Sequence, residues 1–136
     1  MDPFSIAVGT LALVQLCIKS SALLRDAIQS INSTNQEVRN ILAELGSLIE
    51  ILQSLERNAT ADKDAFTSLD FVLKQCTRAC DNLHEALSKA LGDSNQSKGI
   101  KVWIRLKRQE NDIEGFKKLI DSYKATLTIA VADANL

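Results

Sequence analysis

Three residues spaced four apart, Cys76, Cys80 and His84, form the most chemically versatile cluster in this sequence. On a helix, positions i, i+4 and i+8 follow one side, so these side chains could supply three ligands to zinc. The two cysteines also fit a run of core positions, where cysteine packs as a small hydrophobe, and no fourth ligand is evident. We therefore interpret the cluster as part of the core and predict no bound metal and no cofactor.

Catalytic chemistry finds little support elsewhere in the chain. Catalysis needs converging nucleophiles, bases or metal ligands, yet the sequence has one histidine and no glycine-rich phosphate loop. The formal net charge of −1 gives no overall attraction to nucleic acid. We expect a protein that is not an enzyme and that binds neither a small-molecule substrate nor nucleic acid.

A basic run near the C-terminal third contains cations interleaved with apolar residues. Lysine and arginine reach phosphate groups, and tryptophan favours the membrane interface. The run is therefore a candidate for binding anionic lipid headgroups, with a solvated helix start beside a loop as the alternative. The candidate residues are Lys98, Lys101, Trp103, Arg105, Lys107 and Arg108.

The N-terminal segment lacks a charged residue from Pro3 to Ile18. A helix that is apolar on every side lies either within a core or in lipid. A membrane span needs about 20 apolar residues, and Lys19 interrupts this one, so insertion would be marginal and therefore switchable. We expect the segment to rest buried in the domain. Its membrane-insertion candidates are Phe4, Ile6, Val8, Leu11, Leu13, Val14, Leu16 and Ile18.

Apolar residues at alternating spacings of three and four predict the helices that position these side chains. The first helix is expected from Pro3 to near Ile31, and the second over about 35–57, with Thr34 and Glu37 as a capping box. A third is expected to begin at Asp62 and to end before the loop-forming stretch at 92–99. A fourth is expected to begin between 99 and 103 and to run to near the C-terminus. The expected core includes Leu13, Leu16, Leu45, Leu52, Leu73, Cys76, Leu83, Phe116, Ile120 and Leu127.

The composition predicts one all-α domain. The chain has 136 residues, of which 46% are hydrophobic, and it contains one proline and five glycines, which favours long helices around a single core. About four such helices bury their stripes most simply in an antiparallel bundle with a hydrophobic N-terminal helix. An elongated coiled-coil dimer is the alternative. An odd number of cysteines and an acid at Asp2 predict a reducing, cytoplasmic environment.

The opening Met1-Asp2-Pro3-Phe4-Ser5, followed by an uncharged small-and-aliphatic helix, resembles the fungal HeLo-like N-terminal domain family. The resemblance covers the chain in architecture and about its first 25 residues in motif. It implies that residues 1–136 form a single HeLo-like bundle, the N-terminal part of a longer protein. Such proteins are fungal NLR-type receptors of innate immunity or executioners of programmed cell death in heterokaryon incompatibility.

In such families, oligomerisation is thought to release or expose the N-terminal helix for membrane attack. The resemblance thus implies an effector that targets or permeabilises the plasma membrane when it self-associates, with anionic lipids as partners. Carried over, the executioner segment would run from Phe4 to Leu24, and Lys19 departs from the uninterrupted span of the family. The alternative is a homotypic or heterotypic helical interaction module without membrane activity.

Overall fold

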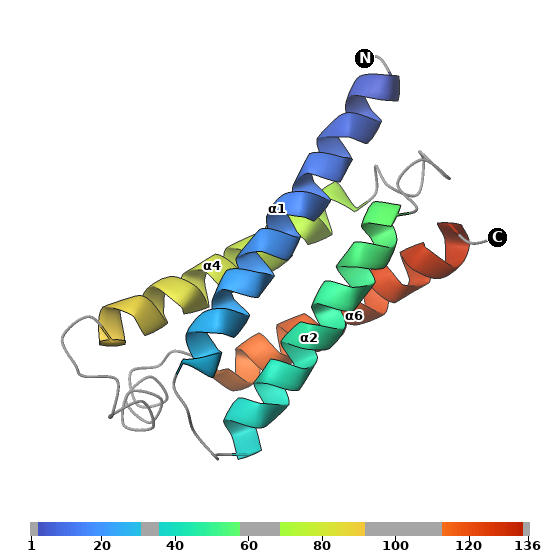
Figure 1. Ribbon diagram of the computed structural model, residues 1–136. Coiled ribbons are helices and arrows are strands. Elements are labelled where there is room, and N and C mark those ends of the chain that lie inside the picture. The colour runs from blue at the N-terminus through green and yellow to red at the C-terminus, as the bar shows by residue number, and fades with distance from the viewer. Residues whose placement is uncertain (1–2, 31–35, 58–68, 92–112, 135–136) are drawn as a thin grey trace.

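A computed structural model describes residues 3–30, 36–57, 69–91 and 113–134 of the chain. These ranges contain four α-helices, which Figure 1 shows as an elongated bundle. They are α1 (Pro3–Gln29), α2 (Gln36–Arg57), α4 (Asp70–Leu91) and α6 (Ile113–Ala134). Within the ranges described, no residue belongs to a strand, so the predicted all-α bundle is confirmed.

The ends of the first two helices agree closely with the apolar periodicity. α1 ends at Gln29, where the Ser30 backbone N–H donates to the Asp26 carbonyl at 3.1 Å and the Ser30 hydroxyl donates to the Ala27 carbonyl at 2.6 Å. α2 occupies Gln36–Arg57, as the sequence predicts. The third helix was expected to begin at Asp62, but α4 begins at Asp70, because Leu69 is a turn residue whose carbonyl accepts from the Leu73 backbone N–H at 2.8 Å. The predicted cap at Thr34, the loop at 92–99 and the start of the last helix lie outside the described residues.

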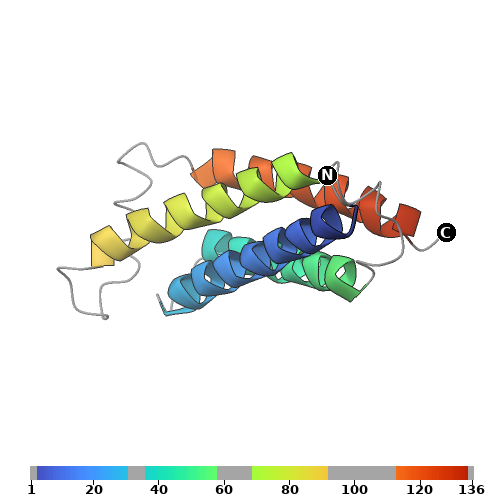
Figure 2. The same cartoon turned by 90° about the horizontal axis from the view of Figure 1, so that it is seen from above.

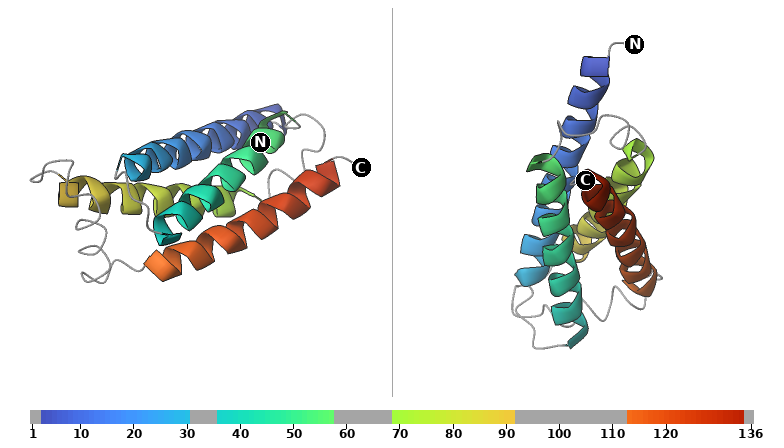
Figure 3. Two further views of the ribbon diagram at one scale, coloured as in Figure 1. Left: turned by 60° about the horizontal axis from the view of Figure 1, so that its bottom comes forward. Right: turned by 90° about the vertical axis from the view of Figure 1, so that its right-hand side faces the viewer.

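The four helices form a ring in which each packs against two others. α1 lies against α4 and α2, and α6 lies mainly against α2 and to a smaller extent against α4. Successive helices alternate in direction, but α2 and α4 lie diagonally across the bundle from each other (Figures 1 and 3). Consequently the packed neighbours α1 and α4 run in the same direction, as Figure 2 also shows.

The core lies between the inward faces of all four helices. Of the expected core residues, Leu45, Leu52, Leu73, Cys76, Leu83, Phe116, Ile120 and Leu127 are buried, which confirms those predictions. On α1 the expectation of burial was partly wrong, because Leu13 is half-buried and Leu16 is 48% exposed. The physical reason is that α1 contacts only two neighbours, so the bundle covers one face of a helix whose apolar residues point to every side.

Candidate functional site

The outward face of α1 carries a stripe of exposed residues at alternating spacings of three and four. We call it the α1 outer stripe, and it comprises Gly9, Ala12, Leu16, Lys19 and Leu23. Leu16 and Leu23 are each 48% exposed, and Lys19 is the one charged residue of the five. Exposed leucines on the same helix face offer a contact for lipid or for another helix.

The inward face of α1 contains polar side chains as well as apolar ones. Thr10, Ser20 and Ser21 are at most 5% exposed, and they alternate with the buried apolar residues Val14 and Leu24. Burying a small polar side chain destabilises the fold unless the side chain is hydrogen-bonded, but its small size lets two helices approach closely. The contact between α1 and α4 is therefore held together partly by hydrogen bonds.

Hydrogen bonds between side chains connect α1 with α4 along this face. The Thr10 hydroxyl donates to Asp70 Oδ1 at 2.9 Å, and Ser21 Oγ lies 3.6 Å from Cys80 Sγ. Between them, the buried Cys17 lies opposite the buried Cys76, at the same offset of 59 residues that separates Ser21 and Cys80. Partners differ by 59 or 60 in residue number, as expected for two parallel helices in register. We call these residues the α1–α4 polar seam, comprising Thr10, Cys17, Ser21, Asp70, Cys76 and Cys80.

The three thiols of the seam are free and fully buried. The neighbouring Cys76 thiol lowers the pKa of Cys17, against the opposing effect of burial. The neighbouring Cys17 and Cys80 thiols and burial away from water raise the pKa of Cys76. Burial, and to a smaller extent these thiols, raises the pKa of Tyr123 on α6. Cys17 therefore ionises more easily than Cys76.

The burial of Cys76 and Cys80 confirms that they occupy core positions. His84, the third member of the cluster recognised in the sequence, is half-buried on the same helix. Among the described residues, no group of three histidine, cysteine or acidic side chains is arranged to hold a metal ion. The neighbour that the structure adds to the cysteine pair is Cys17, which comes from a different helix.

A second polar contact joins α2 and α6 at the surface. Lys124 Nζ lies 2.7 Å from Glu44 Oε2, and the bond from Lys124 lowers the pKa of Glu44. The neighbouring Glu44 carboxylate raises the pKa of Asp121. Both partners of the ion pair are partly exposed, so the contact joins α2 to α6 at the solvent-facing edge of the bundle, which we call the rim.

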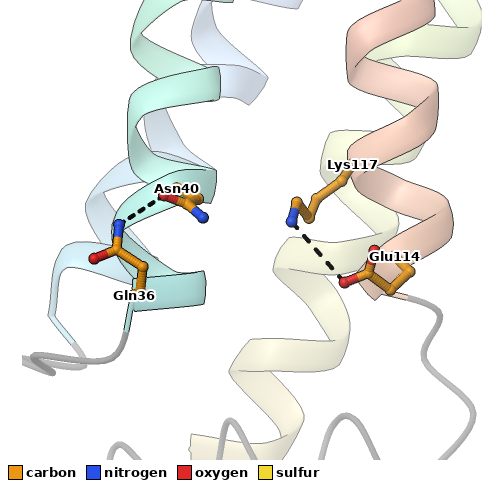
Figure 4. A network of polar contacts seen from close by, with 4 residues as sticks. All are labelled: Gln36, Asn40, Glu114 and Lys117. Carbon is orange, nitrogen blue, oxygen red and sulfur yellow. Dashed lines mark hydrogen bonds and ion pairs between the residues drawn. The ribbon is translucent and has the colours of Figure 1, made fainter.

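The same rim continues toward the beginnings of α2 and α6. Figure 4 shows the Gln36 amide donating to Asn40 Oδ1 at 2.8 Å on α2, and Lys117 paired with Glu114 at 3.9 Å on α6. Asn40 and Lys117 point toward the space between the two helices. The α2–α6 contact therefore has a solvent-facing polar edge, whereas the polar contacts between α1 and α4 are buried or partly buried.

The structure places the membrane-insertion candidates on α1 but in different environments. Val14 is buried, Leu11, Leu13 and Ile18 are half-buried, and Leu16 is exposed. The side chains of Phe4, Ile6 and Val8 lie outside those described. In the parts of the chain that the structure covers, no helix has the length and hydropathy needed to cross a membrane.

The headgroup candidates all fall between residues 92 and 112, outside the described ranges, so their role remains a prediction from the sequence. They are Lys98, Lys101, Trp103, Arg105, Lys107 and Arg108. Conversely, sequence reasoning missed the polar seam. The available signal was the spacing of Thr10, Cys17 and Ser21, which are seven and four residues apart and therefore share one helix face.

Comparison with known proteins gives one match. The family model described as pigment biosynthesis cluster protein PigL N-terminal matches residues 1–136. Searches among curated proteins and among solved structures give no match. The match covers the whole chain, and its description places the matching segment at the N-terminus of its parent proteins.

Proposed function

We propose that this chain, which belongs to the PigL N-terminal family, is a non-enzymatic N-terminal effector domain that acts through α1. Together with the resemblance to HeLo-like domains, this suggests the signalling domain of a fungal immune-type receptor. On oligomerisation, the domain would move from the cytoplasm to the plasma membrane, bind or permeabilise it, and so trigger regulated cell death. The observation that carries the proposal is the α1 outer stripe, where Leu16 and Leu23 face outward.

The energetics of the stripe explain why oligomerisation would be needed. Fully burying a leucine side chain contributes about 1.5 to 3 kcal/mol, so covering the exposed half of Leu16 and Leu23 contributes roughly 2 kcal/mol in total. That is too little for stable membrane binding by one copy. When several copies are held together, their contributions combine and raise the overall affinity by orders of magnitude.

The basic run would add an electrostatic contribution to this binding. Each lysine or arginine near an anionic membrane contributes about 1 kcal/mol, and salt weakens that attraction. Reversing the charges of Lys98, Lys101 and Arg105 should therefore abolish association with anionic vesicles at physiological salt. Circular dichroism should show unchanged helicity in this variant.

A helical interaction module is the second candidate function. The α1 outer stripe has the alternating spacing of three and four by which helices pack together, and no described helix is suited to crossing a membrane. In this case the stripe would be covered by a helix of another protein or of a second copy. The two functions differ in whether lipid is required.

Vesicle sedimentation and dye leakage test the proposal. The intact domain should be compared with a form fused to a trimeric coiled coil, with and without anionic lipid. The diagnostic variant is Leu16→Gln with Leu23→Gln. Its matched control is Leu119→Gln with Ile129→Gln on α6, where the replaced side chains are 45% and 63% exposed. Substitution is preferable to deleting α1, because α1 also supplies core residues such as Val14 and Leu24.

We expect the trimeric form to bind and permeabilise anionic vesicles much more strongly than the single domain. The α1 variant should reduce binding at least about thirtyfold, which corresponds to the roughly 2 kcal/mol that the two leucines contribute. The α6 variant should bind as the parent does. If trimers neither bind nor leak the vesicles, the interaction module becomes the better explanation.

A further inference from the structure

The α1–α4 polar seam brings three free thiols together inside the bundle. The register set by the Thr10–Asp70 and Ser21–Cys80 contacts places Cys17 opposite Cys76, and all three thiols are buried and free. Cys17 belongs to α1, whereas Cys76 and Cys80 belong to α4. One bond between two of these sulfurs would therefore join the helices covalently.

Geometry favours one of the possible pairs. A disulfide requires Cβ atoms about 3.5 to 4.5 Å apart, whereas side chains four residues apart on one helix have Cβ atoms about 5 to 6 Å apart. Cys76 and Cys80 are such a pair. Cys17 and Cys76 instead face each other across two parallel helices, one turn before the contacting pair Ser21 and Cys80 on each helix. The adjacent contacts Thr10–Asp70 and Ser21–Cys80 hold that register.

We propose that Cys17 and Cys76 form a reversible redox lock, in which a peroxide oxidises the two thiols to a disulfide that joins α1 to α4. Cys17 is the initial nucleophile, and its lowered pKa favours this role. Its thiolate attacks one peroxide oxygen, the O–O bond breaks, and hydroxide leaves, so that Cys17 becomes a sulfenic acid. The Cys76 sulfur then attacks the Cys17 sulfur and water leaves. Two thiols and one hydrogen peroxide thus give one disulfide and two waters.

Burial determines when the reaction takes place. All three sulfurs are fully buried, so peroxide reaches Cys17 only during local openings of α1, and oxidation is slow in the packed bundle. When α1 repacks, Cys17 returns to Cys76 and the disulfide closes. The lock therefore holds α1 against α4 after oxidation, and a thiol reductant releases it. The proposal concerns packing alone and does not depend on whether α1 meets lipid.

The test is oxidation of the purified intact domain with hydrogen peroxide, followed by peptide mapping and thermal melts. We expect a loss of two hydrogen atoms per monomer and one cross-linked peptide pair containing Cys17 and Cys76. The crosslink encloses the second half of α1, all of α2 and the start of α4, so the melting temperature should rise by about 10 °C. Dithiothreitol should reverse both changes.

Alanine variants separate the three thiols. Cys17→Ala and Cys76→Ala should each prevent the crosslink and the rise in melting temperature, whereas the matched control Cys80→Ala should retain both. Mapping of the parent protein decides the question even if one variant folds poorly. A disulfide between Cys76 and Cys80, a disulfide between monomers, or oxidation to sulfinic acid without a crosslink would each overturn the proposal. None of these readouts uses vesicles, so failure here is distinguishable from failure of the proposed function.

Discussion

α1 and α2 are packed neighbours that distribute their polarity in opposite ways. On α2 every buried residue is apolar, while Arg39, Glu50 and Glu56 face solvent. On α1 the hydroxyls of Thr10, Ser20 and Ser21 are buried, while Leu16 and Leu23 are exposed. The total hydrophobicity of a helix therefore does not indicate how many of its apolar residues are buried in the core.

The difference has an energetic consequence. A buried aliphatic side chain stabilises packing by transfer from water and by close contact, whereas a buried hydroxyl must first recover the hydrogen bonds that it lost to water. α2 is thus attached through apolar contacts along its whole length. α1 is attached through apolar contacts interrupted by a polar seam. We expect substitutions on the inner faces of the two helices to have different effects.

Leu45→Ala on α2, compared with Ser21→Ala on α1, tests this difference most directly. Both side chains are fully buried. Removing the leucine should lower the free energy of unfolding by about 2 to 5 kcal/mol, whereas removing the hydroxyl should lower it by about 1 kcal/mol or less. Urea denaturation measures both. Equal losses would contradict the contrast between an apolar and a polar inner face.

Thr10→Val examines the hydrogen bond that joins the starts of the two parallel helices. It removes the hydroxyl that donates to Asp70 while keeping the shape of the side chain, and should cost about 1 to 2 kcal/mol because the acceptor is charged. Thr126→Val is the matched control, because its exposed hydroxyl bonds only within α6, to the Ser122 carbonyl. The control should change stability by less than about 0.5 kcal/mol. Similar losses in both variants would show that the Thr10–Asp70 bond contributes no more stability than the exposed Thr126–Ser122 bond.

Gly9→Ala on α1 and Gly46→Ala on α2 compare how much a more favourable helical backbone stabilises each of the two helices. An added Cβ would meet nothing within 4 Å at either glycine. Each substitution should therefore raise the free energy of unfolding by about 0.5 to 1 kcal/mol, because alanine favours a helix over glycine. Urea denaturation of the two single variants provides the measurement. A gain on α2 without one on α1 would show that the beginning of α1 contributes little to the cooperative fold.

Lys124→Met addresses the rim contact of α2 and should have the smallest effect. The ion pair with Glu44 is partly exposed, so its loss should cost about 0.2 to 1 kcal/mol at pH 7. The pKa of Glu44 is lowered by Lys124, so the stability from this carboxylate is present above its unfolded pKa of about 4.3 and is lost as the pH falls through its lower folded pKa.

Asp121 has the opposite pH dependence, because Glu44 raises its pKa. The stability that Asp121 contributes is present at low pH and is lost as the pH rises through its folded pKa. The loss caused by Lys124→Met should therefore shrink as the pH falls from 7 to 3, because protonation of Glu44 removes its charge. Urea denaturation at pH 7 and pH 3 checks this, with the exposed Lys118→Met as control. A loss that is equal at the two pH values would exclude an ionic origin.

The amphipathic helices could be predicted from the sequence because their two faces differ in chemistry. Repeats such as Val38 to Leu55 have charged residues on the opposite side, so the inner face of α2 follows from the spacing alone. The same reasoning placed Leu73, Cys76 and Leu83 correctly on α4. By itself, the sequence therefore determined the helical class, the position of α2 and most of the core.

Tertiary structure alone decided how α1 faces its neighbours. From Pro3 to Ile18 the helix lacks a charged face, so the spacing could not show that Leu16 points outward. The pairing of Cys17 with Cys76 depends on the register between two helices that are distant in sequence. That register follows from the parallel packing of α1 and α4, with α2 placed diagonally opposite α4. Such an arrangement is set by how whole faces fit together, which local periodicity does not encode.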